Sequence, residues 1–300
     1  MTRRTEKESD VIRPVTWRIA GGRVLGPAFF FVVGIVNCTP DSFYDGGLCF
    51  DSDAGISHSL ELLEQGADIV DIGGESTRPF SQRVSIERER DRVLPVLRGV
   101  LAQKPQAVVS VDTYRAQIAA EALQAGAVIV NDVSGFSLDP DLIQVLADYK
   151  PGYVLMHSRG RPEDMQKDPS YSDVVGEVFS FFESTMNRLV QAGVPQECIV
   201  LDPGIGFGKL LEHNLELLAN IAEFYPLDRP IYMGLSNKSM WSKLLNVAIS
   251  ERCMATQVAT GLLAAKGVPI HRVHEVDETV RTLRIVQAMQ EHARGGNNGR

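Results

Sequence analysis

Polar side chains follow apolar runs at intervals along the whole chain. Each run is short and rich in β-branched residues, as buried strands are, and what comes next can do chemistry: Asn37, Asp112, Asn131, His157, Asp202, the segment Ser236–Ser239, and Arg272 with His274. Carboxylates and amides can pair with the amidine-like edge of a flat heterocycle, and a guanidinium can clamp phosphate oxygens through two parallel bonds. This pattern predicts a pocket for a polar ring and an anion.

Eight strands are needed to position these residues. The apolar runs are Val32–Val36, Ile69–Ile72, Ala107–Val111, Val128–Val130, Tyr153–Met156, Ile199–Leu201, Ile231–Met233 and Ile270–Val273. Segments of helical period lie between them, for example Ile118, Ala122 and Ala125. Strictly alternating strands and helices predict an α/β fold, a single (β/α)8 TIM barrel; a doubly wound open sheet is the lesser alternative.

In a parallel barrel the carboxyl ends of all strands lie on one face, where barrel enzymes hold their active sites. The plainer interpretation of each polar residue is that it caps the following helix, as Ser236 is expected to do beside Lys238. Arg272 and His274 are two residues apart and therefore share one side of the last strand, at a barrel end that often binds phosphate. A lone His157 is expected to be structural.

Composition excludes several other classes of protein. The net charge of −8 disfavours nucleic acid and anionic membranes as partners, and the longest apolar run is far shorter than the ~20 residues of a membrane helix. Four scattered cysteines and no His/Cys cluster argue against disulfides and structural zinc. The charged first residues do not resemble a secretory signal, so we expect a cytoplasmic protein. We predict disordered tails at residues 1–15 and 294–300 around one domain, 16–293.

Seven blocks in order then resemble one family. They are NCTPDSFYDGG, GADIVDIGGESTRP, SVDTYRA, GAVIVNDVSG, VLMHSRG, LDPGIGFGK and RVHEV, and they span roughly residues 32–290. Together they are similar to the dihydropteroate synthases, pterin-binding barrels that join 6-hydroxymethyl-7,8-dihydropterin diphosphate to 4-aminobenzoate in folate biosynthesis. The resemblance implies a dissociative displacement, in which the pterin carbon–oxygen bond breaks before the arylamine attacks and diphosphate leaves.

The resemblance also implies residue roles. Pterin would be bound by Asp112, Asn131, Met156, Asp202, Phe207 and Lys238; diphosphate by Asn37, Arg78, Arg272 and His274; and aminobenzoate by Phe43, Thr77, Pro79 and Ser239. The catalytic set would be Arg78, Asp112, Lys238, Arg272 and His274. Asn37 would share a magnesium ion (Mg2+) with the substrate phosphates, and the family implies a homodimer.

Three positions depart from the family pattern. The family usually has Arg where Asn237 stands, Gly at Phe80 and Phe at Met240. Because Phe80 and Met240 flank the expected aminobenzoate site, we hypothesise an altered response to sulfonamides, the drugs that mimic aminobenzoate. Two alternatives to a synthase are a corrinoid-type pterin methyltransferase and a pterin-binding paralogue without turnover.

Overall fold

The computed structural model describes residues 14–39, 52–76, 83–160 and 169–295, and its centre is a barrel of eight parallel strands. The strands are β3 (Phe31–Asn37), β4 (Ile69–Gly73), β5 (Val109–Asp112), β6 (Ile129–Asp132), β7 (Gly152–Met156), β8 (Ile199–Asp202), β9 (Tyr232–Gly234) and β10 (Ile270–Val273). Their order is β8-β7-β6-β5-β4-β3-β10-β9, and a parallel bridge between Leu201 and Ile231 joins the two ends of the sheet. The predicted (β/α)8 barrel is confirmed.

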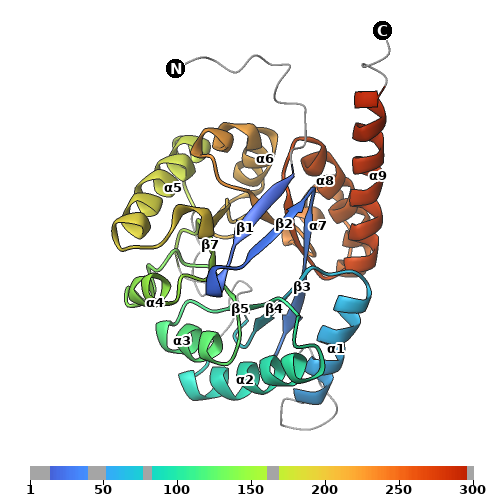
Figure 1. Ribbon diagram of the computed structural model, residues 1–300. Helices are drawn as coiled ribbons and strands as arrows, with labels where there is room; N and C mark the ends of the chain where they lie inside the picture. The colour runs from blue at the N-terminus through green and yellow to red at the C-terminus, as the bar shows by residue number, and fades with distance from the viewer. Residues whose placement is uncertain (1–13, 40–51, 77–82, 161–168, 296–300) are drawn as a thin grey trace.

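Helices form a ring around these strands (Figure 1). They are α1 (Ser52–Glu64), α2 (Ile86–Gln103), α3 (Ala116–Gln124), α4 (Leu142–Tyr149), α5 (Val174–Gln191), α6 (Leu211–Ala219), α7 (Ser239–Leu245), α8 (Arg252–Ala265) and α9 (Val276–Gly295). Each long helix turns one apolar face to the strands; in α2 that face includes Val93, Leu97 and Val100, all fully buried. The side chain of Ser85 caps the same helix by accepting a bond from the backbone N–H of Arg88 at 3.2 Å.

The predicted strands coincide with the observed ones to within two residues. The largest shifts are at β5, which begins at Val109 where the apolar run begins at Ala107, and at β6, which ends at Asp132 where the run ends at Val130. Burial explains the continuous apolar runs, because the sheet is covered by helices outside and filled by side chains inside. The polar residue at each carboxyl end therefore marks where a strand leaves the core.

An N-terminal hairpin was not predicted. Strands β1 (Val15–Arg18) and β2 (Val24–Ala28) pair antiparallel and lie across the middle of the ring in Figure 1. Trp17 is fully buried, and its indole N–H donates to the carbonyl oxygen of Cys198 at 2.7 Å. Trp17 packs among the first residues of the barrel strands, including Phe31 and Ile270. The hairpin thus closes the amino end of the barrel and leaves the carboxyl end for a site, and β1 starts one residue inside the predicted tail.

Two further expectations concern the described residues alone. No helix within them has the length and apolar character needed to cross a membrane. Cys38, Cys198 and Cys253 are free thiols, whereas Cys49 lies outside the described residues.

Candidate active site

The predicted site residues that the structure describes gather at the carboxyl end of the barrel. Backbone register aligns them: Asn37 is level with Gly73, Gly73 with Asp112, Asp112 with Asn131, and Met156 with Asp202. The segment before α7 supplies Lys238, and β10 supplies Arg272 with His274 just beyond it. Phe43, Thr77, Arg78 and Pro79 lie outside the described residues, so their predicted roles stay predictions.

Arg272 is the centre of a buried ionic network. Its Nε donates to Asp71 Oδ2 at 2.6 Å and its Nη2 donates to Asp112 Oδ2 at 2.7 Å. The amide of Asn131 donates to the same oxygen of Asp71 at 2.8 Å. Asp71 is fully buried and the side chain of Arg272 is 19% exposed. Four strands, β4, β5, β6 and β10, are thereby joined: the guanidinium of Arg272 holds Asp112, and the carboxylate of Asp71 holds Asn131.

The charges in this network shift one another's protonation. Burial raises the pKa of Asp112 to about 7; the cation of Arg272 opposes that rise and the carboxylate of Asp71 adds to it. Burial works against the charge of Arg272, but the two carboxylates outweigh it and raise the pKa of the guanidinium above its ordinary value. Asp112 is therefore a carboxyl group whose ionisation near neutral pH responds to any charged ligand.

Asp202 and Lys238 supply a second pair of charges. Asp202 accepts a bond from the backbone N–H of Gly204 at 2.7 Å, and burial raises the pKa of its carboxyl group to about 6. Burial lowers the pKa of Lys238 to about 8. The Lys238 ammonium lies 4.2 Å from the centre of the Phe207 ring, within cation–π range. An anion, a cation and an aromatic face thus stand together at the ends of β8 and β9.

An apolar wall completes the pocket. Met156, Tyr114 and Val133 form a small buried cluster, separate from the main core, and Phe207 packs against it. Met156 and Phe207, which the resemblance assigns to the pterin pocket, are therefore neighbours in the structure. Acids, amides and a cation around an apolar wall suit a flat, polar ring system.

The loop after β8 is supported by a lysine that we had not assigned to the site. Lys209 is 2% exposed. Its ammonium donates to the carbonyl oxygens of Gly204 at 3.0 Å, Phe207 at 3.1 Å and His157 at 3.2 Å, and it lies 3.0 Å from His157 Nδ1. At Gly204 a Cβ atom would stand 1.9 Å from the carbonyl oxygen of His157, so only glycine fits. The expected structural role of His157 agrees with these contacts.

The prediction for Ser236 was wrong. Helix α7 begins at Ser239 with Lys238 as its N-cap residue and no side-chain capping bond. The Ser236 hydroxyl instead lies 2.8 Å from both His274 Nδ1 and Glu275 Oε2. The hydroxyl of Ser236 therefore contacts the segment between β10 and α9 and does not cap helix α7.

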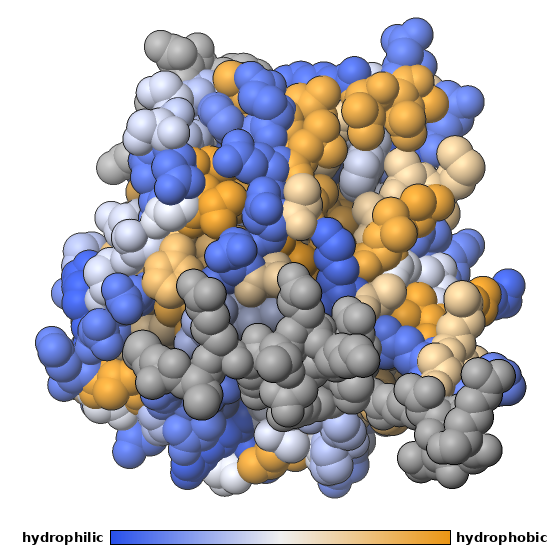
Figure 2. All heavy atoms as spheres, turned by 90° about the horizontal axis from the view of Figure 1, so that it is seen from above, coloured by the Kyte–Doolittle hydropathy of each residue, from blue (hydrophilic) through white to orange (hydrophobic). Residues whose placement is uncertain are grey.

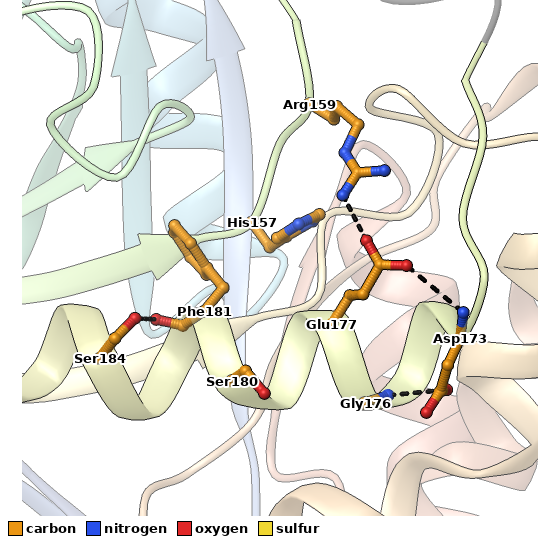
Figure 3. A pocket seen from close by; sticks show the side chains of 8 residues that line it. All are labelled: His157, Arg159, Asp173, Gly176, Glu177, Ser180, Phe181 and Ser184. Atoms are coloured by element: carbon orange, nitrogen blue, oxygen red, sulfur yellow. Dashed lines mark hydrogen bonds and ion pairs between the residues drawn. The ribbon is translucent and has the colours of Figure 1, made fainter.

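A separate polar groove runs beside helix α5 (Figure 3). Figure 3 shows Glu177 joined to the guanidinium of Arg159 and to the backbone of Asp173, while Asp173 caps the helix through Gly176. Of the residues around this groove, only His157 is a strand-end residue singled out from the sequence. The groove holds none of the predicted pterin ligands, so we do not take it as the active site.

Two residues of the site were missed for different reasons. Asp71 lies in the middle of an otherwise apolar strand, IVDIG. The prediction considered only polar residues at strand ends and therefore did not include it. A carboxylate inside a buried strand is itself a signal, because buried charges need partners. Lys209 ends the glycine-rich motif, and nothing in its spacing distinguishes a buried lysine from a solvated one.

Comparison with known proteins agrees with this geometry. A family model described as "Pterin binding enzyme" matches residues 33–274. The dihydropteroate synthase of Escherichia coli K12 is 42% identical over 257 residues, which is 86% of this chain and 90% of that protein. The corresponding protein of Synechocystis is 39% identical over 260 residues, covering 86% of this chain and 90% of the other.

Solved structures show the same likeness in three dimensions. Yersinia pestis dihydropteroate synthase with a sulfonamide drug complex superposes with a TM-score of 0.85 at 40% identity, covering 91% of this chain and 98% of the other. The Xanthomonas albilineans enzyme with 4-aminobenzoic acid gives 0.85 at 39% identity, over 92% and 99%. The same enzyme with 7,8-dihydropteroate gives 0.81 at 36% identity, over 92% and 99%.

Proposed function

The chain belongs to the dihydropteroate synthases, a family of pterin-binding enzymes, and we propose that its barrel mouth condenses a dihydropterin diphosphate with 4-aminobenzoate to give 7,8-dihydropteroate and diphosphate. The observation that carries the proposal is the Arg272 network together with Asp202, Lys238 and Phe207. A relative's complex with 4-aminobenzoic acid and another with 7,8-dihydropteroate support the choice of substrate and product.

The reaction needs charge stabilisation more than a nucleophile. As the pterin carbon–oxygen bond breaks, positive charge develops on the ring and negative charge on the departing diphosphate. Asp112 and Asp202 favour the cationic ring, and Lys238 fits its carbonyl oxygen; Arg272 and His274, with Arg78, serve the diphosphate. Such preorganised groups act strongly in a site that excludes water. Ser239, exposed at the start of α7, serves aminobenzoate with Phe43, Thr77 and Pro79.

Magnesium fits this site only as a shared ion. Among the described residues no three His, Cys, Asp or Glu side chains form a metal cluster. Mg²⁺ usually keeps few protein ligands and is completed by substrate phosphates and water. The side chain of Asn37, at the end of β3, offers one such oxygen. A bound ion would neutralise charge on the diphosphate, and the chain itself would contribute Asn37 to hold it.

One experiment tests the function. We would incubate the purified protein with the pterin diphosphate and Mg²⁺, with and without 4-aminobenzoate, and follow diphosphate release and dihydropteroate mass. Product that requires both substrates supports the synthase. Tight pterin binding without product would favour a paralogue without turnover, and methyl transfer from a methylated pterin would favour the methyltransferase alternative.

Pterin affinity should depend on pH. The raised pKa of Asp202, about 6, means that this carboxyl is protonated at lower pH, where it loses its charge and can no longer accept bonds from the ring on both oxygens. We expect the affinity for a substrate-like pterin, measured by calorimetry, to rise about tenfold per pH unit below pH 6 and to level off above pH 7, where Asp112 also ionises. Asp202→Asn should bind more weakly and lose most of this slope. An unchanged slope in that variant would assign the titration to another group.

We also propose a homodimer in the cytoplasm. Met254, Val258 and Leu262, four residues apart on α8, are 66%, 57% and 64% exposed. Ile285 and Met289 on the adjoining helix α9 are 61% and 69% exposed. Figure 2 shows hydrophobic side chains gathered on the side of the molecule where these helices lie. Such a contiguous apolar patch is typical of a surface covered by another subunit, and we propose a second copy of this chain as that subunit.

The dimer predicts the effect of a charge on α8. We expect Val258→Glu to convert the dimer to a monomer in sedimentation equilibrium, because each interface would bury two unpaired carboxylates. Val24→Glu is the matched control, since Val24 is 56% exposed on β2, in the hairpin that covers the amino end of the barrel. A V258E protein with the mass of the unaltered protein would place any self-association elsewhere.

Phe80 lies outside the described residues, so the sulfonamide hypothesis remains a prediction. Asn237 and Met240 are described. Met240, in the first turn of α7, is buried, and the amide of Asn237 donates to Glu275 Oε1 at 3.1 Å. A Phe80→Gly variant with an unchanged ratio of sulfonamide to aminobenzoate affinity would exclude Phe80 as the cause of an altered drug response.

A further inference from the structure

The Ser236 hydroxyl lies where three groups compete for one proton. It is 2.8 Å from Glu275 Oε2, 2.8 Å from His274 Nδ1, and it accepts a bond from the backbone N–H of His274 at 3.2 Å. An ionised carboxylate can only accept hydrogen bonds, and a hydroxyl has one proton to give. The serine proton therefore points to Glu275.

This count of donors determines which nitrogen of the His274 imidazole carries the hydrogen. With its proton on Glu275, Ser236 can only accept from Nδ1 of His274, so Nδ1 must carry a hydrogen. The amide of Asn237 is consistent with this assignment: its nitrogen donates to Glu275 Oε1 at 3.1 Å and lies farther, at 3.4 Å, from His274 Nδ1. Both oxygens of Glu275 are thus engaged by donors from the segment between β9 and α7, and Ser236 is buried, which protects the arrangement from water.

We propose that Glu275, acting through Ser236, is a positioning residue that keeps the proton of His274 on Nδ1. The ring atom that serves the substrates is then Nε2. The inference rests on the proposed function for its chemistry. Because Nδ1 already carries the ring hydrogen, Nε2 is the atom that takes up a proton from solvent, and when the pterin carbon–oxygen bond breaks and its electron pair goes to the diphosphate, Nε2–H of the resulting imidazolium donates to an oxygen of that leaving group. A histidine held in the other tautomer would lose the bond from Nδ1–H to Ser236 that orients the ring.

The test replaces the carboxylate by an amide of the same size. In Glu275→Gln the side-chain amide can donate to Ser236, whose proton then turns to His274 Nδ1 and moves the ring hydrogen to Nε2. Long-range nitrogen–proton NMR spectra of the full chain labelled at its six histidines distinguish the two tautomers, and a His274→Asn protein identifies the signal. We expect Nδ1 to be protonated in the unaltered protein and Nε2 in E275Q.

Turnover provides the second readout. We expect E275Q to lower kcat on the order of 10- to 100-fold, as loss of an orienting partner commonly does, with KM for 4-aminobenzoate little changed. Glu278→Gln, three residues after Glu275 in the first turn of α9, is the matched control and should alter neither spectrum nor kcat. Ser236→Ala should leave a mixture of tautomers, and Ser236→Thr, which restores a hydroxyl, should recover the Nδ1–H form.

Three results would overturn the proposal. They are an Nε2–H tautomer in the unaltered protein, a tautomer that E275Q and S236A both leave unchanged, and an E275Q protein with full kcat. The spectra need no turnover, so they separate this inference from the proposed function: an inactive chain with the expected tautomer shift would contradict the synthase assignment and leave the role of Glu275 on His274 intact.

Discussion

Arg272→Met should lower kcat/KM about 1,000-fold and the free energy of unfolding by about 3–5 kcal/mol, the range for breaking a buried ion pair by removing one partner. Methionine fills much of the same volume but gives no donor. Asp71 and Asp112, both buried, would lose their common cation. Steady-state kinetics and urea unfolding measure the two effects separately.

The pH dependence of that loss has a defined sign. Without the guanidinium, the pKa of Asp112 should rise further above its present value of about 7. A carboxyl with a raised folded-state pKa contributes stability that is full at low pH and disappears as pH rises through that pKa. The stability difference between R272M and the unaltered protein should therefore be constant below about pH 7, where Asp112 is protonated in both folded proteins, and grow as the pH rises above 7.

A surface arginine gives the matched control. Arg281 pairs with Asp277 within α9, and its side chain is 72% exposed. Arg281→Met should change the stability by less than about 0.5 kcal/mol, because exposed pairs contribute little. If both variants lose the same small amount, the Arg272 network is not a major source of stability and its acids find other partners.

Much of the fold could be predicted because buried strands and helices have recognisable patterns of apolar residues in the sequence. A parallel strand covered on both faces is apolar throughout, so runs such as Tyr153–Met156 stand out, and β7 is found there. The hairpin β1–β2 escapes this rule. Of its first strand only Trp17 is buried, and a short ribbon with one buried residue has no periodicity to detect.

The site was predictable where a polar residue ends a strand and unpredictable where it lies deeper. Asp112, Asn131 and Asp202 were predicted because each is the first polar residue after an apolar run. The partners that hold them, above all Asp71, are chosen by three-dimensional contacts between residues as far apart as Asp71 and Arg272. Ser236 shows the same limit: its local sequence offers a helix cap, and a contact with Glu275, the residue before α9, overrides it.

Substitution of Lys209 should produce the other large loss of stability and pterin affinity, because its ammonium donates hydrogen bonds to buried carbonyl oxygens. Lys209→Met keeps the length of the side chain but leaves the carbonyl oxygens of His157, Gly204 and Phe207 without the ammonium that now serves them. The Gly204 oxygen keeps a bond from the backbone N–H of Phe207 at 3.1 Å, so the oxygens of His157 and Phe207 are the two that lose their donor. Each buried acceptor left unsatisfied costs about 1–3 kcal/mol, so we expect a loss of about 2–6 kcal/mol in urea unfolding. The loop that carries Phe207 should loosen, and pterin affinity, measured by calorimetry, should fall about tenfold.

Lys238→Met separates the loss of pterin affinity from the loss of stability. Lys238 lies against the Phe207 ring, within the same site, but no carbonyl of the loop depends on it among the described residues. It should lose pterin affinity with little change in stability, whereas K209M should lose both. Equal stability of K209M and K238M would mean that water or a rearranged backbone replaces the Lys209 ammonium.

The pH profile then identifies the group responsible. Burial lowers the pKa of Lys209 from 10.5 to about 7, so over that window the unfolded chain binds the proton more tightly than the folded one. Stability from this group must rise with pH between those values, and K209M must lack that rise. The stability gap between the two proteins should therefore widen from pH 7 toward pH 9. A gap that stayed constant over this range would show that the buried lysine keeps its proton.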